Sequence, residues 1–310
     1  MAQSKDRALR NRAINGWRLF WLVTGPISAL MVFSMMRAVP SSGEAVSAMI
    51  QLSVRCAVPW LYLAFAASSV LVLFPGQFGR WLLSNRKFLG LCFAAAMAWQ
   101  LSFIVWLVTV YKDYYITEVY VLRDVIEGVG GYLFLIAMTL TSFRPGRKLL
   151  RPRSWKLLHK SGIYFLWAYA FSVYWWALFY YPDPDWIDYL FYWTGLLAWG
   201  LRAAAWSKKQ QQLAGKKTPK TSSQPAFLWI GAVLIGFGLI AASSGSVWWE
   251  TVEEFLTGYS FTRIPELYLP YWPPIPFLPL FIISAGAFLT TTSRVPRAAG
   301  TGEQPSAAQP

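Results

Sequence analysis

Apolar stretches of about 20 residues, separated by shorter polar segments, recur along most of the chain. A helix of that length crosses the hydrocarbon core of a bilayer. We therefore predict an all-α fold, a polytopic membrane helix bundle of about eight transmembrane helices. The predicted spans are residues 18–38, 54–75, 88–111, 122–143, 157–180, 186–206, 227–249 and 271–292.

The polar segments divide the chain into five predicted parts. A basic cytoplasmic N-terminus (1–17) precedes a six-helix transmembrane body (18–206), a cytoplasmic linker (207–225), a two-helix transmembrane hairpin (226–293) and a disordered cytoplasmic tail (294–310). The sequence shows neither a glycine-rich dinucleotide motif nor a P-loop. We therefore expect any flavin or nicotinamide group to be supplied by a separate partner.

The composition supports a membrane protein and narrows its chemistry. Of 310 residues, 56% are hydrophobic and 14% are charged, too few charges for the surface of a soluble globular protein of this size. The only two cysteines, Cys56 and Cys92, fall in apolar segments, which excludes a disulfide framework and a CxxC motif. His159 is the single histidine, so a metal site built from several histidines is excluded.

The net charge of +14 is distributed unevenly between the predicted loops. With the N-terminus in the cytoplasm, 23 of the 28 Lys and Arg lie on the inner side and 12 of the 14 Asp and Glu lie on the outer side. This positive-inside pattern predicts cytoplasmic N- and C-termini, in a bacterial inner membrane. The charge also attracts anionic lipid headgroups, and we expect no nucleic-acid partner.

Several polar residues in or near the predicted spans are candidates for chemistry. His159 begins the fifth span and is either a haem ligand or proton relay, or an interfacial histidine bonded to headgroups. Gln100, near mid-bilayer, either joins helices by hydrogen bonds or faces a cavity. Arg123, Asp124 and Glu127 open the fourth span, where they form either a cap and local ion pair or a proton or cation site.

Aromatic side chains are abundant, with 18 Trp, 16 Tyr and 21 Phe. Many lie at the outer boundary of the predicted spans, as in the aromatic belts of membrane proteins. A second interpretation is an aromatic conduit, or a lipid or quinone site.

Two segments resemble the ferric reductase-like transmembrane domain. They are RKFLGLCFAAAMAWQ, which opens the third span, and LTSFRPGRKLLRPRSWKLLHKSGIYFLWAYAFSVYWW, which joins the fourth span to the fifth. The resemblance covers residues 54–206, and the family includes the haem-binding membrane subunit of bacterial methionine-sulfoxide reductase, NADPH oxidases and metalloreductases. A resemblance at this level implies a fold more strongly than an activity.

The family resemblance implies haem b held between histidines of two facing helices. Only one of the three family positions that we can place keeps its histidine, His159. Gln100 and Ser172 stand at the other two, and neither residue type is a usual axial ligand. We therefore predict a divergent member of the family that has lost haem binding.

Three functions remain open at this point. The first is that of a non-enzymatic membrane or partner subunit. The second is that of a haem- or quinone-linked electron-transfer component that receives electrons from a soluble or membrane redox partner. The third is that of a transporter that uses Asp124 and Glu127. The missing haem-ligand histidines favour the first function. The sequence shows no inverted repeat of the kind typical of transporters, which weighs against the third.

Overall fold

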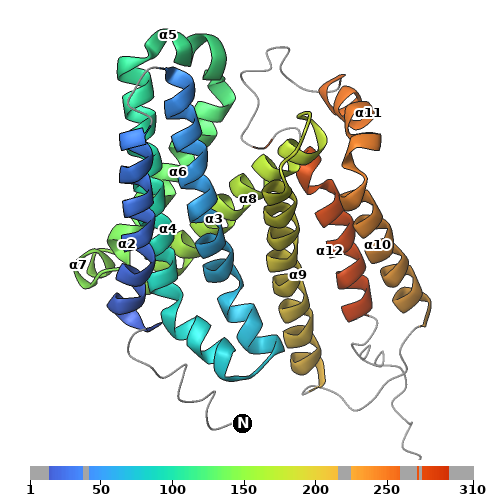
Figure 1. Ribbon diagram of the computed structural model, residues 1–310. Helices are drawn as coiled ribbons and strands as arrows, with labels where there is room; N and C mark the ends of the chain where they lie inside the picture. The colour runs from blue at the N-terminus through green and yellow to red at the C-terminus, as the bar shows by residue number, and fades with distance from the viewer. Residues whose placement is uncertain (1–13, 38–41, 216–224, 259–270, 272–273, 293–310) are drawn as a thin grey trace, which may run out of the picture. The chain divides into compact units, whose positions relative to one another are not determined.

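The computed structural model describes residues 14–37, 42–215, 225–258, 271 and 274–292, and this part of the chain is helical throughout, with no strand (Figure 1). Residues 1–13 of the predicted N-terminal segment 1–17 and the predicted tail 294–310 lie outside it. The longer helices are α2 (Gly16–Arg37), α3 (Gly43–Leu73), α4 (Gln77–Val110), α6 (Leu122–Thr141), α8 (Pro152–Phe179), α9 (Trp186–Gly215), α10 (Pro225–Ser243), α11 (Gly245–Gly258) and α12 (Leu278–Thr292). Short elements are α5 (Lys112–Tyr114), η2 (Tyr115–Val119), α7 (Arg144–Lys148) and η4 (Ile275–Phe277).

Six helices in the described residues are long and apolar enough to cross a membrane, which makes the chain a helical membrane protein. They are α2, α3, α4, α6, α8 and α10. The predicted span in α9 lacks a sufficiently apolar window, and the last apolar helix, Ile275–Thr291, is shorter than the others. The count of eight spans stays a prediction.

Several helix ends differ from the predicted spans because hydropathy locates the apolar part of a helix rather than its termini. α3 begins at Gly43, 11 residues before the predicted start, and the Oγ atom of Ser42 caps it by accepting the Ala45 N–H at 3.3 Å. α4 likewise begins at Gln77, and α8 begins at Pro152, so His159 lies two turns inside α8. Proline suits the first turn of a helix because backbone N–H groups there have no acceptor within the helix, so the N–H group that Pro152 lacks costs no hydrogen bond.

The second half of the chain also departs from the predicted boundaries. The predicted linker begins as helix, because α9 continues to Gly215 through Lys- and Gln-rich sequence with good helix propensity. Residues 216–224 lie outside the described part. The predicted span 227–249 is divided at Ser244, where α10 gives way to α11.

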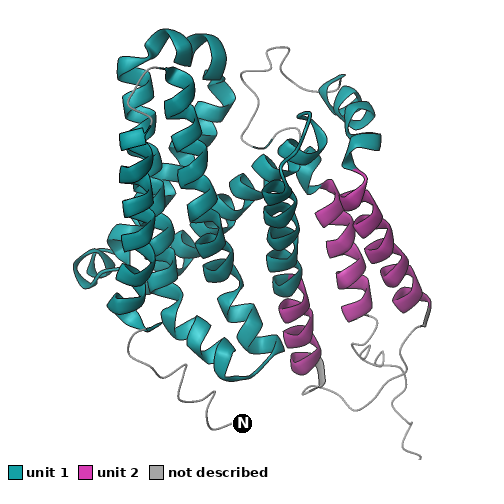
Figure 2. Cartoon of the chain, viewed as in Figure 1, with its two compact units in different colours: residues 1–202, 245–277 teal, residues 203–244, 278–310 magenta. Residues whose placement is uncertain are grey.

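The chain forms two compact units (Figure 2). Unit 1 comprises residues 1–202 and 245–277, and unit 2 comprises residues 203–244 and 278–310. In unit 1, α3 packs along α4, α2 packs against α4, and α8 packs against α6 and α3. Its interior is rich in large aromatic side chains, among them Phe65, Phe171, Trp175 and Tyr192, all fully buried.

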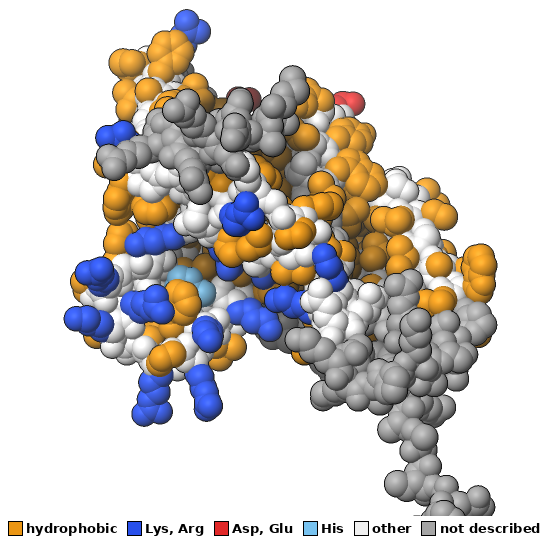
Figure 3. Space-filling model, turned by 90° about the horizontal axis from the view of Figure 1, so that it is seen from below, with side chains coloured by type: hydrophobic (Ala, Val, Ile, Leu, Met, Phe, Trp, Pro, Cys, Tyr) orange, Lys and Arg blue, Asp and Glu red, His pale blue; other side chains and the backbone are white. Residues whose placement is uncertain are grey.

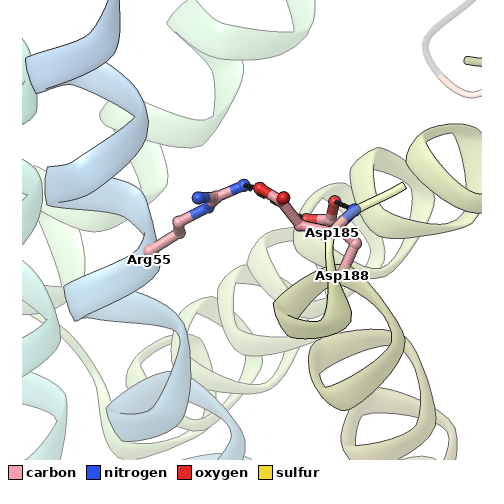
Figure 4. Close-up of polar contacts among 3 residues, drawn as sticks. All are labelled: Arg55, Asp185 and Asp188. Carbon is pink, nitrogen blue, oxygen red and sulfur yellow. Dashed lines mark hydrogen bonds and ion pairs between the residues drawn. The ribbon is translucent and has the colours of Figure 1, made fainter. Parts of the chain in front are cut away.

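Within unit 1, an ion pair joins α3 to the segment that leads into α9 (Figure 4). The Nη2 atom of Arg55 lies 2.6 Å from a carboxylate oxygen of Asp185 and 3.7 Å from one of Asp188. Asp188 also accepts the backbone N–H of Asp185 at 3.0 Å, which holds the two carboxylates together. Arg55 lies next to residue 54, where the second predicted span begins, and the structure places it three turns inside α3.

Unit 2 is held together by the close approach of α10 and α12. A Cβ atom at Gly231 would lie 2.7 Å from the carbonyl oxygen of Gly286, and one at Gly286 would lie 2.6 Å from the carbonyl oxygen of Gly231. Both positions therefore require glycine. Small residues at helix contacts are typical of membrane bundles, where close backbone packing replaces the hydrophobic effect.

The outward faces of the spanning helices are strongly apolar. Large side chains exposed there include Trp21 on α2, Leu133 and Leu140 on α6, and Val233 and Ile240 on α10, each at least 62% exposed. A soluble protein rarely exposes so much apolar surface, whereas a lipid-facing helix requires it.

Candidate functional site

The three positions identified through the family resemblance have separate surroundings. On α4, the Oε1 atom of Gln100 accepts the hydroxyl of Tyr132 on α6 at 2.8 Å. On α8, the hydroxyl of Ser172 donates to the carbonyl oxygen of Tyr169 at 2.9 Å, and the side chain is buried. Gln100 therefore joins α4 to α6, and the structure does not bring Gln100 and Ser172 into one site.

His159 is held by α6 and by its own helix. Its Nε2 atom lies 3.0 Å from the Oγ1 atom of Thr141, and its ring packs against Trp155 with centroids 4.4 Å apart. The Thr141 hydroxyl oxygen also lies 2.7 Å from the carbonyl oxygen of Ala137. The tautomer of His159 decides which of His159 and Thr141 is the donor in their contact, and in either case the Nε2 atom is hydrogen-bonded within the protein.

A first cavity, of about 480 Å³, lies in unit 1 between α6, α8, α11 and η4. We call it the acidic pocket because three carboxylates and one guanidinium line it. Its lining comprises Val121, Arg123, Asp124, Glu127, Tyr169, Ser172, Val173, Trp176, Tyr180, Tyr181, Glu253, Tyr271, Pro276 and Phe277. Four residues singled out in the sequence, Arg123, Asp124, Glu127 and Ser172, thus meet in one cavity.

The charges of the acidic pocket are largely satisfied within it. The Nε atom of Arg123 lies 3.5 Å from a carboxylate oxygen of Asp124. Glu127, buried in α6, accepts the backbone N–H of Tyr271 at 2.7 Å, and the Tyr271 hydroxyl donates to the carbonyl oxygen of Phe165 at 3.0 Å. Tyr271 has a left-handed backbone, with φ of 62°. Glu127 therefore anchors a residue 144 positions away in the chain.

Glu253 on α11 is a residue of the acidic pocket that the sequence analysis missed. Partial burial raises the pKa of its carboxyl group, and the nearby Arg123 charge opposes that shift. Besides Tyr271, Pro276 and Phe277, its neighbours in the pocket come from α6 and α8, more than 70 residues earlier in the chain. No local pattern in the sequence reports such a distant contact.

A second cavity, of about 460 Å³, lies at the other end of α8 between α3, α4, α6 and α9. We call it the basic pocket, because six cations and His159 line it with no carboxylate. Its lining comprises Ala64, Arg86, Lys87, Gly90, Leu91, Met138, Thr139, Thr141, Ser142, Arg147, Trp155, Lys156, His159, Lys160, Ile163 and Arg202. Figure 3 shows Lys and Arg side chains gathered around the histidine on this face.

The residues present do not fit a haem held between two histidines. The chain has one histidine, and its Nε2 atom is hydrogen-bonded to Thr141. A haem held between two histidines needs a second histidine opposite the first, and the chain has none. Within the described residues, no group of three or more His, Cys, Asp or Glu is placed to hold a metal ion.

Comparison of the chain with protein-family models, with curated proteins and with solved structures finds no match.

Proposed function

We propose that this chain is a bacterial inner-membrane protein with a ferric reductase-like body that works without haem, as a non-enzymatic membrane or partner subunit. In this proposal it spans the membrane about eight times, with both termini in the cytoplasm. The basic pocket then faces the cytoplasm and the acidic pocket faces outward.

The proposal rests on the hydrogen bonds made by the side chains at the three haem-ligand positions. The side chains at these positions hydrogen-bond within the chain, His159 to Thr141, Gln100 to Tyr132 and Ser172 to the backbone of Tyr169. A haem at these positions would need to break such bonds, and breaking the bond of the buried Ser172 would leave its hydroxyl group without a partner. The bonds give these residues a structural role that needs no cofactor.

The second candidate, a haem- or quinone-linked electron-transfer component, is favoured by a column of contacting aromatic rings in unit 1. From Phe65 the rings pass through Trp167, Phe171, Tyr192 and Phe179 to Trp175, with neighbouring centroids 5.1–5.7 Å apart. The column begins beside Arg202 at the basic pocket. Such packing also serves as an ordinary bundle core, since aromatic pairs prefer these distances.

The visible absorption spectrum distinguishes the two candidates. The full chain is expressed with added haem precursor, purified in detergent, and measured oxidised and dithionite-reduced beside the His159→Ala variant. The proposal predicts no stoichiometric Soret band in either protein, and a monodisperse folded chain. A stoichiometric Soret band with sharp reduced bands, lost in His159→Ala, would overturn the haem-free proposal and establish the electron-transfer function.

A further inference from the structure

The basic pocket concentrates positive charge without neutralising it. Its six cations are Arg86, Lys87, Arg147, Lys156, Lys160 and Arg202. Among the residues that the structure describes, none of these six lies within ion-pair distance of a carboxylate; the pairs found there involve only Arg55 and Arg123. Because like charges in a partly apolar cavity repel one another, such a cluster is stabilised by an anion between them.

Arg202 is the cation whose surroundings point most directly to a ligand. Its guanidinium lies over the ring of Phe65 at 4.2 Å and over the ring of Tyr164 at 4.6 Å. Its Nη1 atom is buried and has no hydrogen-bond partner in the described part of the chain. A buried N–H of a charged group is costly to leave unpaired, so the ring contacts hold Arg202 in place while one donor stays available.

The other arginines of the pocket are also fixed by contacts with the wall. The Nε atom of Arg86 donates to the carbonyl oxygen of Ala64 at 3.0 Å. The Arg147 guanidinium lies 4.7 Å from the centre of the Trp155 ring, and Trp155 donates to the carbonyl oxygen of Thr141 at 3.0 Å. Three guanidinium groups are thus positioned before any ligand arrives, which lowers the entropy cost of binding.

We propose that the basic pocket binds a phosphate group that belongs to a larger molecule. Guanidinium groups match phosphate oxygens in paired hydrogen bonds, and lysines add charge. The cavity of about 460 Å³ exceeds the space that one phosphate needs, and Leu91, Met138 and Ile163 give it apolar walls. A phospholipid headgroup and a soluble phosphate ester share this chemistry, and basic pockets between membrane helices are known sites for anionic headgroups.

This inference does not depend on the absence of haem. The absorption spectrum tests haem binding through His159, whereas phosphate binding depends on the cations and is measured separately. Either proposal can therefore fail alone.

Native mass spectrometry of the full chain in detergent tests the inference, because bound lipids and phosphates appear as distinct mass increments. The delipidated protein is titrated with cardiolipin, an anionic lipid, and with phosphatidylcholine, a control lipid without net charge. It is titrated separately with inorganic pyrophosphate. We expect cardiolipin to bind at least tenfold more tightly than phosphatidylcholine. We expect Arg202→Gln to weaken that binding about tenfold, the effect of losing a strong charged contact.

Two further variants keep the result interpretable. Lys156→Gln removes an exposed charge at the pocket and leaves the buried packing intact, so it tests the site even where Arg202→Gln reduces folding. Arg153→Gln removes an equally exposed charge from the same helix outside the pocket lining. We expect about a threefold loss for Lys156→Gln and less than a twofold loss for Arg153→Gln.

The outcomes separate the two sources of phosphate. Competition between pyrophosphate and cardiolipin would support one phosphate site open to both, binding of cardiolipin alone would assign a lipid headgroup, and binding of pyrophosphate alone would assign a soluble phosphate compound. Binding of neither, or an equal loss in Arg153→Gln and in the pocket variants, would overturn the proposal.

Discussion

The acidic and basic pockets have nearly the same volume, about 480 and 460 Å³, and opposite charge. Both are lined by α8, with Ser172 in the acidic pocket and His159 in the basic pocket, 13 residues or about 20 Å apart along the helix axis. The same helix therefore presents two chemically different cavities at its two ends.

The pockets differ in how far their charges are satisfied from within. In the acidic pocket, Glu127 holds the backbone of Tyr271, and Asp124 lies beside Arg123. In the basic pocket, the cations contact aromatic rings and carbonyl oxygens but no carboxylate of the described residues. The acidic pocket therefore chiefly joins distant segments of the chain, whereas the basic pocket has positive charges that are available to bind an anion.

The largest effect should come from breaking the aromatic packing in the interior of unit 1. Phe171 on α8 is fully buried and stacks on Trp167 and Tyr192 at 5.2 and 5.3 Å. Phe171→Ala should lower the free energy of unfolding by about 3–5 kcal/mol, because it leaves a large cavity. Thermal unfolding in detergent measures this. Phe237→Ala, at a position 58% exposed, is the control and should change stability little; equal losses would contradict the packing argument.

The hydrogen bond between Glu127 and Tyr271 in the acidic pocket should give the next largest effect. Glu127→Ala removes the acceptor for the Tyr271 N–H and should cost about 1–3 kcal/mol of unfolding free energy. Glu127→Gln retains an amide oxygen as acceptor and should cost clearly less. Denaturant unfolding of both variants measures the difference. If Glu127→Gln were as damaging as Glu127→Ala, the negative charge rather than the hydrogen bond would be the stabilising feature.

Paired and unpaired cations should respond in opposite directions. Arg55→Gln breaks an exposed ion pair with Asp185 and should lower stability by up to about 1 kcal/mol. Lys156→Gln removes one of several like charges in the basic pocket and should leave the delipidated protein equally or more stable. Thermal unfolding at low salt measures both, and high salt should reduce both effects. Destabilisation by Lys156→Gln without ligand would contradict the repulsion argument.

The smallest effect concerns the pH dependence of the acidic pocket. Burial raises the pKa of Glu253 above its unfolded value, so folding favours the protonated carboxyl group. Stability from this group is therefore greatest below the unfolded pKa of about 4.3 and declines as the pH rises through the folded pKa. Glu253→Gln should slightly raise the melting temperature at pH 7 and flatten its slope between pH 4 and 7. The exposed Glu254→Gln should preserve the slope, and an unchanged slope in Glu253→Gln would contradict the assignment.

The helical membrane fold could be predicted because it depends on local properties. A run of 20 apolar residues predicts a spanning helix without reference to the rest of the chain, and α2 and α6 lie close to their predicted positions. The ends of α3 and α4 were missed because polar residues continue the helix beyond the apolar window. The break at Ser244 was missed because α11 continues the apolar and aromatic pattern of α10.

The candidate site was predictable only in part. His159, Arg123, Asp124 and Glu127 could be identified because ionisable residues are rare in or near membrane spans. Their partners could not, since Tyr271 and Glu253 reach the acidic pocket across more than 125 residues of sequence. Arg202 could not be singled out from the sequence, because it belongs to the basic residues that indicate the orientation of the chain in the membrane. Its contacts with the rings of Phe65 and Tyr164 distinguish it in the structure.

In the proposed topology, the acidic pocket lies outside the membrane and the basic pocket lies in the cytoplasm. Cysteine labelling tests it most directly, in a Cys56→Ser and Cys92→Ser background. Tyr181→Cys reports on the acidic pocket and Lys156→Cys on the basic pocket, since both side chains are exposed pocket residues. A membrane-impermeant maleimide should label Tyr181→Cys in intact spheroplasts and Lys156→Cys only after permeabilisation. Labelling of both variants from the same side would contradict the account.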